Sequence, residues 1–476
     1  MNPTIQIETD LSPLMALPEA LREHHYTESA VAELLGLWDI SELSGPAYPL
    51  YCWRCRPNFS ALSSLVQVFL LGLPTTRERL RELLGRTVVA KLLELGLFED
   101  EGGLLCSNCV IYPCLGRYIV TDHWVSLGTQ TEGKVYELGT DSYVLARVTP
   151  RRQGRALDLC TGSGVHAVHS ASSYSPTWAV DINPRALVFT KLNAAIQGVE
   201  LEVVEGDLYQ PVKGETFDLV TANPPFVPSP DPEVLIHRSA GTTGEEVPER
   251  LVAGLKESLN RGGLFSMVLE HPVYAQETYL DRLERWLGST HGWGIAVLTF
   301  REYAIGSYIL RHLGGVRDPE ASYNAYLTSY ADVGIEAMRF ANVFITRLPY
   351  SAPNWKTELT APWPNFDISD QVGEWLESLV HYNNPEWSPA ENWVPALNGR
   401  FTDLLVSHNS STGILQKDHF TWLEPPLLSP EETELLKLIL ETGESVAGLR
   451  ERWPHNSCRF NQALRGLGLA RAVGVG

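Results

Sequence analysis

Hydrophobic residues in the middle of the chain fall into short apolar runs that alternate with amphipathic, helix-like segments. Strands separated by helices form parallel sheets with helices on both faces, so this alternation predicts a doubly wound α/β domain. A later segment, 302–334, interrupts the alternation, and we expect it to carry substrate specificity. The predicted strands are seven runs with the length and composition of buried strands: 156–160, 178–180, 201–204, 217–221, 264–269, 294–299 and 340–346.

A different pattern, of three helices followed by a hairpin, precedes this domain. Apolar residues repeat at helical spacing over 62–70, and a third helix ends near Gly96. Between them, Thr75 and Glu78 have the spacing of a capping box, and a glycine pair at 102–103 later separates two short apolar runs. Three helices and a hairpin are the outline of a winged helix. Because the pattern has no basic recognition helix, it favours dimerisation or substrate docking over DNA binding.

The last quarter of the chain has two parts. Residues 352–426 are rich in Pro, Trp and Asn and low in regular pattern. After Ser429 an apolar stripe at 435–439 predicts a small helical or winged module. The expected domains are an N-terminal winged-helix-like domain at 1–130, the α/β domain at 131–350 and a C-terminal extension with the small module at 351–476.

Composition and charge narrow the class of protein. Of the 476 residues, 44% are hydrophobic and 20% are charged, which is typical of a globular chain. No apolar run approaches the about 18 residues of a membrane-spanning helix. The first residues lack the basic start and apolar core of a signal peptide, so we expect a cytoplasmic protein without membrane attachment. The net charge of −20 argues against binding a phosphate backbone, which depends on Lys and Arg.

The seven cysteines include two pairs with the spacing of zinc ligands, Cys52 with Cys55 and Cys106 with Cys109. The gap between the pairs is longer than in a zinc ribbon. The second pair also runs into a strand-like segment, where positions three apart face opposite sides. We therefore expect buried, reduced cysteines and no metal, with a structural zinc as the alternative.

A glycine-rich turn follows the first predicted strand of the α/β domain. Glycines let the backbone turn tightly and approach a ligand at the carboxyl end of that strand, where open α/β sheets bind ligands. The candidate ligand-binding residues of this turn are Asp158, Cys160, Thr161, Gly162 and Gly164.

Three further strand ends carry residues suited to an adenosine and to an amino group. Asp181 and Ile182 end the second strand, where a carboxylate can accept hydrogen bonds from both ribose hydroxyls. Asp207 and Leu208 end the third, where a carboxylate can accept from the adenine amino group. The sequence Asn-Pro-Pro-Phe at 223–226 ends the fourth. Because parallel strands end at one edge of a sheet, these residues are expected to form one site.

These motifs resemble the class I S-adenosylmethionine-dependent methyltransferases. The Asn-Pro-Pro-Phe loop is similar to that of the amino-group methyltransferases, and residues 183–187 and 223–227 look most like the release-factor glutamine N5-methyltransferases. The resemblance covers about 135–350. It implies a seven-stranded Rossmann-like methyltransferase sheet, S-adenosyl-L-methionine as cofactor and no need for a metal. The N-terminal and C-terminal regions depart from the family pattern.

The resemblance also implies how the loop acts. The Asn223 side-chain oxygen and the Pro224 carbonyl each accept one N–H of the acceptor –NH2, which directs the nitrogen lone pair at the methyl group. Phe226 offers a face on which a planar group stacks. Asn223 thereby also borders the cofactor. Upstream, Thr140 and Asp141 correspond to a stretch that caps the methionine end of the cofactor in related enzymes.

The leading hypothesis is an N-methyltransferase for an amide or amino nitrogen of a protein, peptide or small metabolite, such as a glutamine in a Gly-Gly-Gln-like loop. One alternative is methylation of adenine or cytosine in RNA or DNA, against which the net charge argues. Another is a non-catalytic cofactor-binding regulator, against which the intact Asn223 loop and Asp181 argue. A homodimer, if one forms, is expected through the winged-helix-like domain.

Overall fold

The computed structural model describes the chain except residues 1–4, 6, 57–58, 124–132, 152, 172, 231–240, 290, 314–316, 350–351, 385–386, 392, 396–427, 470–472 and 474–476. The boundaries expected after residues 130 and 350, and most of the first six residues, lie outside the described part. Within it, every helix is too short or too polar to cross a lipid bilayer.

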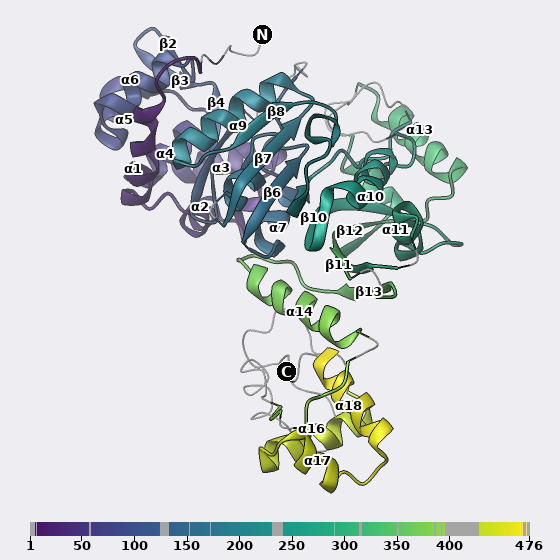
Figure 1. Cartoon of the computed structure of the whole chain (residues 1–476). Coiled ribbons are helices and arrows are strands. Elements are labelled where there is room, and N and C mark those ends of the chain that lie inside the picture. The colour runs from purple at the N-terminus through teal and green to yellow at the C-terminus, as the bar shows by residue number, and fades with distance from the viewer. Residues whose placement is uncertain are drawn as a thin grey trace.

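One mixed sheet forms the centre of the molecule (Figure 1). Its order is β13-β11-β12-β10-β9-β6-β7-β8, and β12 is antiparallel to both of its neighbours, whereas the other pairs are parallel. All seven predicted strands are present in it. The strands are β6 (Gly154–Leu159), β7 (Tyr174–Asp181), β8 (Glu202–Glu205), β9 (Phe217–Ala222), β10 (Leu259–Val273), β11 (Trp293–Ala304), β12 (Ala337–Arg347) and β13 (Trp355–Thr360).

The expected count of seven strands is wrong, because β13 adds an eighth strand within the described residues. Its side chains alternate between half-buried and exposed, the pattern of a strand with one covered face. This short alternation was not predicted as a strand, because the sequence around it is rich in Pro and Trp and shows little regular pattern. Gly294 of β11 lies opposite Trp355, and the indole occupies the space that a Cβ at Gly294 would need. The sheet therefore continues beyond residue 350.

Helices cover both faces of the sheet, as the alternation predicts. On one face, α7 (Thr140–Val148) and α14 (Ser369–Tyr382) pack on side chains such as Ala156 and Leu264. On the other, α10 (Glu246–Ser258) and α11 (Tyr279–Leu287) pack on the alternate side chains, such as Leu157 and Phe265. The period-2 alternation of strand side chains thus divides the core into two layers. The α/β Rossmann-like class is confirmed.

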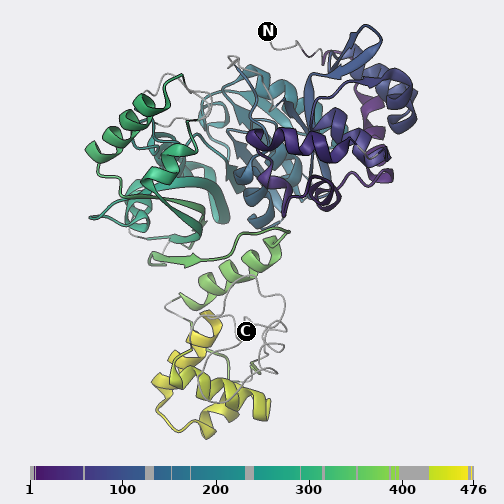
Figure 2. The same ribbon diagram turned by 180° about the vertical axis from the view of Figure 1, so that it is seen from behind.

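The N-terminal region packs beside the sheet, as the view from behind shows (Figure 2). Its β1, β2 and β3 form a small sheet in the order β1-β3-β2, and the hairpin predicted around 102–103 is present. The predicted capping box is wrong by one residue. Thr76, not Thr75, caps α5 by accepting from the Arg79 N–H at 3.2 Å, because α5 begins at Arg77 and Thr76 is the residue directly before it. The elements are α1 (Leu17–Glu23), α2 (Glu28–Leu35), α3 (Tyr48–Cys55), α4 (Ala61–Phe69), β1 (Thr75–Thr76), α5 (Arg77–Leu84), α6 (Arg86–Glu94), β2 (Phe98–Glu101) and β3 (Leu104–Ser107).

A second hairpin, β4 (Cys109–Cys114) and β5 (Arg117–Asp122), joins this region to the central domain. It rests on α9 (Pro184–Gln197), which carries Asn193 on its buried face. The Asn193 amide accepts from the Val120 N–H at 2.8 Å and donates to the Val120 carbonyl at 2.9 Å. One apolar core therefore runs from the N-terminal helices into the central domain.

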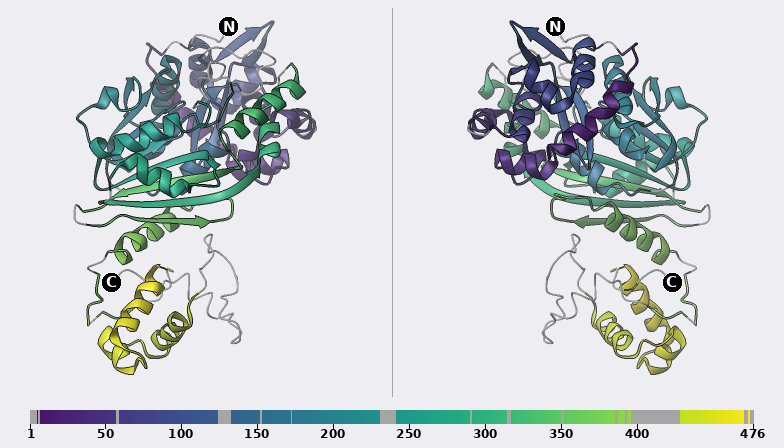
Figure 3. Two further views of the ribbon diagram at one scale, coloured as in Figure 1. Left: turned by 90° about the vertical axis from the view of Figure 1, so that its right-hand side faces the viewer. Right: turned by 90° about the vertical axis from the view of Figure 1, so that its left-hand side faces the viewer.

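The C-terminal helices form a module with its own core. They are α16 (Pro430–Thr442), α17 (Val446–Arg452) and α18 (Ser457–Leu469). Ser429 and Glu432 form a capping box at the start of α16. The module lies beyond α14, away from the sheet (Figure 3).

Helix α7 contains the largest fully buried side chain, that of Arg147. Its guanidinium lies 2.7 Å from Glu28 Oε2 and 2.9 Å from Asp39 Oδ2, and it donates to the Pro364 carbonyl at 2.9 Å. Because removal of one member of a buried ion network leaves its partners desolvated and unpaired, this cluster is costly to break.

We therefore expect Arg147→Ala to lower the free energy of unfolding by about 3–5 kcal/mol. The matched control is Arg77→Ala, because the pair of Arg77 with Asp100 is 38% and 40% exposed and should contribute less than about 1 kcal/mol. Urea denaturation followed by tryptophan fluorescence measures both. Equal losses in the two variants would contradict the assignment.

Candidate active site

The glycine-rich turn lies between β6 and α8 (Val165–Ser170). Gly164 has φ +79°, and a Cβ there would lie 2.8 Å from the Thr190 methyl carbon, so only glycine lets the turn rest on α9. Cys160 also has a positive φ, +56°, although it carries a side chain. Such strained residues concentrate at ligand sites, where the surrounding contacts hold them in place.

Asp158 fixes the shape of this turn through hydrogen bonds on the side of the turn that faces the protein interior. Its carboxylate is buried and accepts from the Thr161 hydroxyl at 2.5 Å, the Thr221 hydroxyl at 2.7 Å and the Ala167 N–H at 3.2 Å. Burial raises the pKa of Asp158 to about 7, whereas these hydrogen bonds lower it. The geometry gives Asp158 a role in shaping the turn, since its oxygens point into the protein.

Asp181 ends β7 and faces the same turn. Its oxygens accept from the Gly162 N–H at 2.8 Å and the Asn183 N–H at 2.9 Å, and burial raises its pKa. A carboxylate has about four acceptor positions, so it can still accept from two hydroxyl groups. The neighbouring Ile182 is 65% exposed, which leaves an apolar surface beside the carboxylate.

The third strand end adds a second carboxylate. Gly206 donates its N–H to the Asp181 carbonyl at 3.0 Å, which places Asp207 beside the end of β7. Arg250 of α10 pairs with Asp207 at 2.6 Å. Leu208 follows with φ +50°. An adenine amino group at Asp207 would therefore share the carboxylate with an arginine that sequence reasoning did not find.

The Asn-Pro-Pro-Phe loop begins directly after β9. The Asn223 amide nitrogen donates to Asp141 Oδ2 at 3.0 Å and lies 3.4 Å from the Ser142 hydroxyl, both at the start of α7. Neither the Asn223 Oδ1 nor the Pro224 carbonyl accepts a hydrogen bond from the described residues. Two oxygens able to accept from one –NH2 group thus come from consecutive residues. Phe226 is partly buried against the core beneath them.

The inserted segment after β11 supports this loop. Tyr330 of α13 (Pro319–Asp332) donates its hydroxyl to the Pro228 carbonyl at 2.9 Å. On the other side, a Cβ at Gly244 would lie 2.3 Å from the Phe226 carbonyl oxygen, so this position also needs glycine. Tyr330 lies 102 residues from Pro228 in the sequence, and no local signal predicts the contact.

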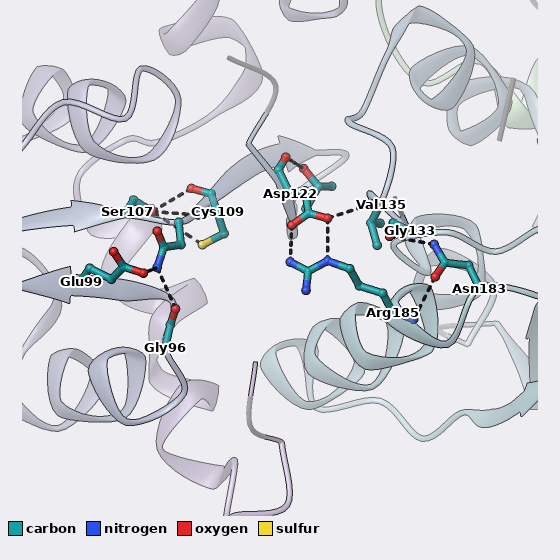
Figure 4. A network of polar contacts seen from close by, with 11 residues as sticks. Gly96, Glu99, Ser107, Cys109, Asp122, Gly133, Val135, Asn183 and Arg185 are labelled. Atoms are coloured by element: carbon teal, nitrogen blue, oxygen red, sulfur yellow. Dashed lines mark hydrogen bonds and ion pairs between the residues drawn. The ribbon is translucent and has the colours of Figure 1, made fainter. Parts of the chain in front are cut away.

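A polar network ties the start of α9 to the hairpin (Figure 4). Arg185 forms a two-pronged ion pair with Asp122, with contacts of 2.8 and 2.5 Å. Asp122 also accepts from the Val135 N–H at 2.8 Å, and Asn183 donates to the Gly133 carbonyl at 3.0 Å. Bidentate pairs are strong and directional. They hold the segment that follows Asp181.

The four cysteines with zinc-like spacing lie on three different elements. Cys52 and Cys55 are on α3, whereas Cys106 is in β3 and Cys109 begins β4. Burial raises the pKa of Cys55 to about 11 and that of Cys109 to about 12, so these thiols keep their protons. The structure places none of the seven cysteines in a disulfide. The described residues contain no group of three or more His, Cys, Asp or Glu side chains that could hold a metal ion.

The arrangement fits S-adenosyl-L-methionine. Asp181 and Asp207 offer acceptors to the ribose and the adenine, and the turn offers backbone close to both. At the Asn223 end, the carboxylate of Asp141 provides negative charge, with Glu270 near enough to raise its pKa further. Negative charge there suits a sulfonium cation.

Comparison with known proteins agrees with this assignment. Residues 136–293 match the family model of the methyltransferase small domain, and residues 23–107 match a domain of unknown function, DUF7059. The ribosomal protein uL3 glutamine methyltransferase of Neisseria gonorrhoeae is 30% identical over 165 residues, 32% of this chain and 55% of the relative. The release factor glutamine methyltransferase of Gloeobacter violaceus is 29% identical over 166 residues, 31% and 58% of the two chains. The chain thus spans just over half the length of these relatives.

The solved structures that the chain matches include the ribosomal protein L11 methylase from Lactobacillus delbrueckii subsp. bulgaricus. It has a TM-score of 0.25 and 17% identity, over 44% of this chain and 82% of that one. A methyltransferase from Pyrococcus furiosus has a TM-score of 0.29 and 16% identity, over 48% and 88% of the two chains.

The resemblance found in the sequence motifs is confirmed by the family match and by the glutamine methyltransferases among the relatives. Residues 136–293 therefore match the methyltransferase small domain, and this part of the chain is similar to the protein glutamine methyltransferases.

Proposed function

We propose that the chain transfers a methyl group from S-adenosyl-L-methionine to the side-chain amide nitrogen of a glutamine in a protein or peptide. The observation that carries this proposal is the pair of acceptor oxygens on Asn223 and Pro224, at the edge of the sheet where the cofactor site lies. The relatives named as uL3 and release factor glutamine methyltransferases support a protein acceptor.

The cofactor-binding residues follow from the strand ends. Asp181 holds the ribose, Ile182 and Leu208 border the adenine, and Asp207 accepts from the adenine amino group. The turn from Cys160 through Thr161 and Gly162 to Gly164 lies along the cofactor, and Asp158 keeps the turn in shape. When bound, the cofactor supplies a methyl group on a sulfonium, which is a good leaving group.

The chain itself must overcome the poor nucleophilicity of an amide nitrogen, whose lone pair is delocalised into the carbonyl. Asn223 Oδ1 and the Pro224 carbonyl each accept one N–H of the acceptor. This holds the nitrogen, favours pyramidal geometry and aims its lone pair at the methyl carbon. Phe226 supports the planar amide from one side. Positioning and electrostatic stabilisation, rather than a strong base, supply the rate enhancement.

The flanking regions complete the proposal. The element order α4-β1-α5-α6-β2-β3 supports a winged-helix-like unit within residues 1–130 that docks the acceptor or a second copy of the chain. The methyltransferase domain at 131–350 is extended by β13 and α14, and the C-terminal module within 351–476 is a second docking unit. We place the enzyme in the cytoplasm.

The class of acceptor is tested with radiolabelled cofactor and cell lysate. We expect label that protease removes and nuclease does not. Label lost to nuclease would instead indicate methylation of a nucleic acid, and label in the small-molecule fraction would indicate a metabolite.

Cofactor binding is tested at Asp181. Because hydrogen bonds to a charged group are stronger than neutral ones, Asp181→Ala should weaken S-adenosyl-L-methionine binding by roughly 10- to 100-fold. Isothermal titration calorimetry measures the affinity. Glu202→Ala removes an exposed carboxylate from the adjacent strand β8 and should leave it unchanged. Unchanged affinity in folded Asp181→Ala would refute the ribose assignment.

Nitrogen methylation is tested at Asn223. Because Asn223→Ala removes one preorganised acceptor, turnover should fall by about 10²–10³, with cofactor affinity nearly unchanged. Asn260→Ala is the control, since that amide donates to Asp218 at the opposite end of the strands. Initial rates are measured on the acceptor found in the lysate. Full turnover by Asn223→Ala would favour an oxygen- or carbon-methylating enzyme.

A further inference from the structure

We propose that Asp141 is a positioning residue for the reaction, which turns the Asn223 amide so that its oxygen faces the acceptor. This inference rests on the proposed function. It also assigns a task to the N-terminal region, because the helix that carries Asp141 is held in place by that region.

An asparagine side chain can present either its oxygen or its nitrogen to a site, and only hydrogen bonds decide which one. An ionised carboxylate accepts hydrogen bonds and cannot donate them. Asp141 Oδ2 lies 3.0 Å from Asn223 Nδ2, so the nitrogen is drawn towards α7 and Oδ1 is left on the other side. The flipped amide would set two oxygens against each other and present an N–H to the acceptor N–H.

The surroundings of Asp141 favour a fixed side chain. It is buried, and it occupies the second position of α7, where the helix dipole and the first backbone N–H groups stabilise negative charge. Burial raises its pKa, and the carboxylate of Glu270 raises it further, whereas the hydrogen bond from Asn223 lowers it. Asn223 therefore provides the side-chain hydrogen bond that stabilises the charged form of Asp141.

Helix α7 is itself held at both ends by the N-terminal region. The Thr140 hydroxyl donates to the Ser41 carbonyl at 3.2 Å, and the Tyr143 hydroxyl donates to the Pro113 carbonyl at 2.8 Å. At its far end, Arg147 enters the buried ion network described above. One face of α7 thus rests on the N-terminal region while Asp141 reaches the acceptor loop. The region that matches DUF7059 contributes part of this support.

The sharpest test exchanges the two residues. Asn223→Asp alone places two carboxylates about 3 Å apart, and like charges at this distance repel, so turnover should fall by roughly 100-fold. Adding Asp141→Asn restores a donor and an acceptor with reversed polarity, and the carboxylate introduced by Asn223→Asp still offers an oxygen to the acceptor. The double variant should therefore recover at least about 10-fold in turnover over Asn223→Asp.

A role in cofactor binding or in packing predicts the opposite outcome, because unrelated defects add. A double variant that is slower than both single variants would overturn the inference. S-adenosyl-L-methionine affinity is measured for each variant by calorimetry. Asp141→Asn alone removes negative charge near the sulfonium and should weaken binding by less than about 10-fold. A larger loss would also overturn the inference, since Asp141 would then be a direct cofactor contact. Glu257→Gln, which neutralises an exposed carboxylate on α10, is the control for loss of charge.

A readout without turnover separates this inference from the proposed function. In protein labelled with ¹⁵N-asparagine, the Asn223 side-chain amide signal, identified by its absence in Asn223→Ala, should exchange slowly with water. Exchange should become at least 10-fold faster in Asp141→Ala. If no lysate protein accepts a methyl group but this protection is seen, the proposed function fails and the orientation stands. Equally fast exchange in both proteins would overturn the orientation.

Discussion

The buried guanidinium of Arg147 is the interaction on which the arrangement of the chain depends. Glu28 and Asp39 come from the N-terminal region, the Pro364 carbonyl comes from the segment before α14, and α7 runs between them. A charge removed from water needs several partners at once, so these segments are fixed relative to one another. The active site is fixed by the same interaction, because α7 contacts the loop after β9 through the hydrogen bond between Asp141 and Asn223.

The active site concentrates buried or half-buried acids for which the described residues supply no ion-pair partner. Asp141, Asp158 and Asp181 all have pKa values raised by burial. Backbone N–H groups, hydroxyls and one amide satisfy their oxygens, which leaves the site polar and net negative. A bound sulfonium would offset part of this cost. The backbone of Cys160 and Leu208, which has positive φ, lies in the same region. This strain lowers the free energy of unfolding but gives the ligand site its shape.

The sequence predicts features that depend on neighbouring residues, but it does not predict contacts between residues far apart in the chain. Each strand end carries its own motif, so Asp181, Asp207 and the Asn223 loop could be assigned to one edge of a sheet without coordinates. The hydrogen bond between Asn223 and Asp141 spans 82 residues, and the contact of Arg147 with Glu28 spans 119. No spacing rule encodes such pairs. Strand β13 was not predicted because six alternating residues are a weak signal. The cap was assigned to Thr75 because α5 begins at Arg77, one residue later than the capping-box spacing indicates.

The two edges of the sheet have a consequence for the chain in a crowded solution. An unpaired strand is a template for another strand, and exposed charges oppose such pairing. At one edge, β13 turns Lys356 outward, where it pairs with Asp281 and Glu284. At the other edge, β8 begins and ends with exposed glutamates. Pairing of another strand with either edge would desolvate these charged side chains, which costs free energy. The long hydrophobic strands of this domain are therefore protected from edge-to-edge aggregation.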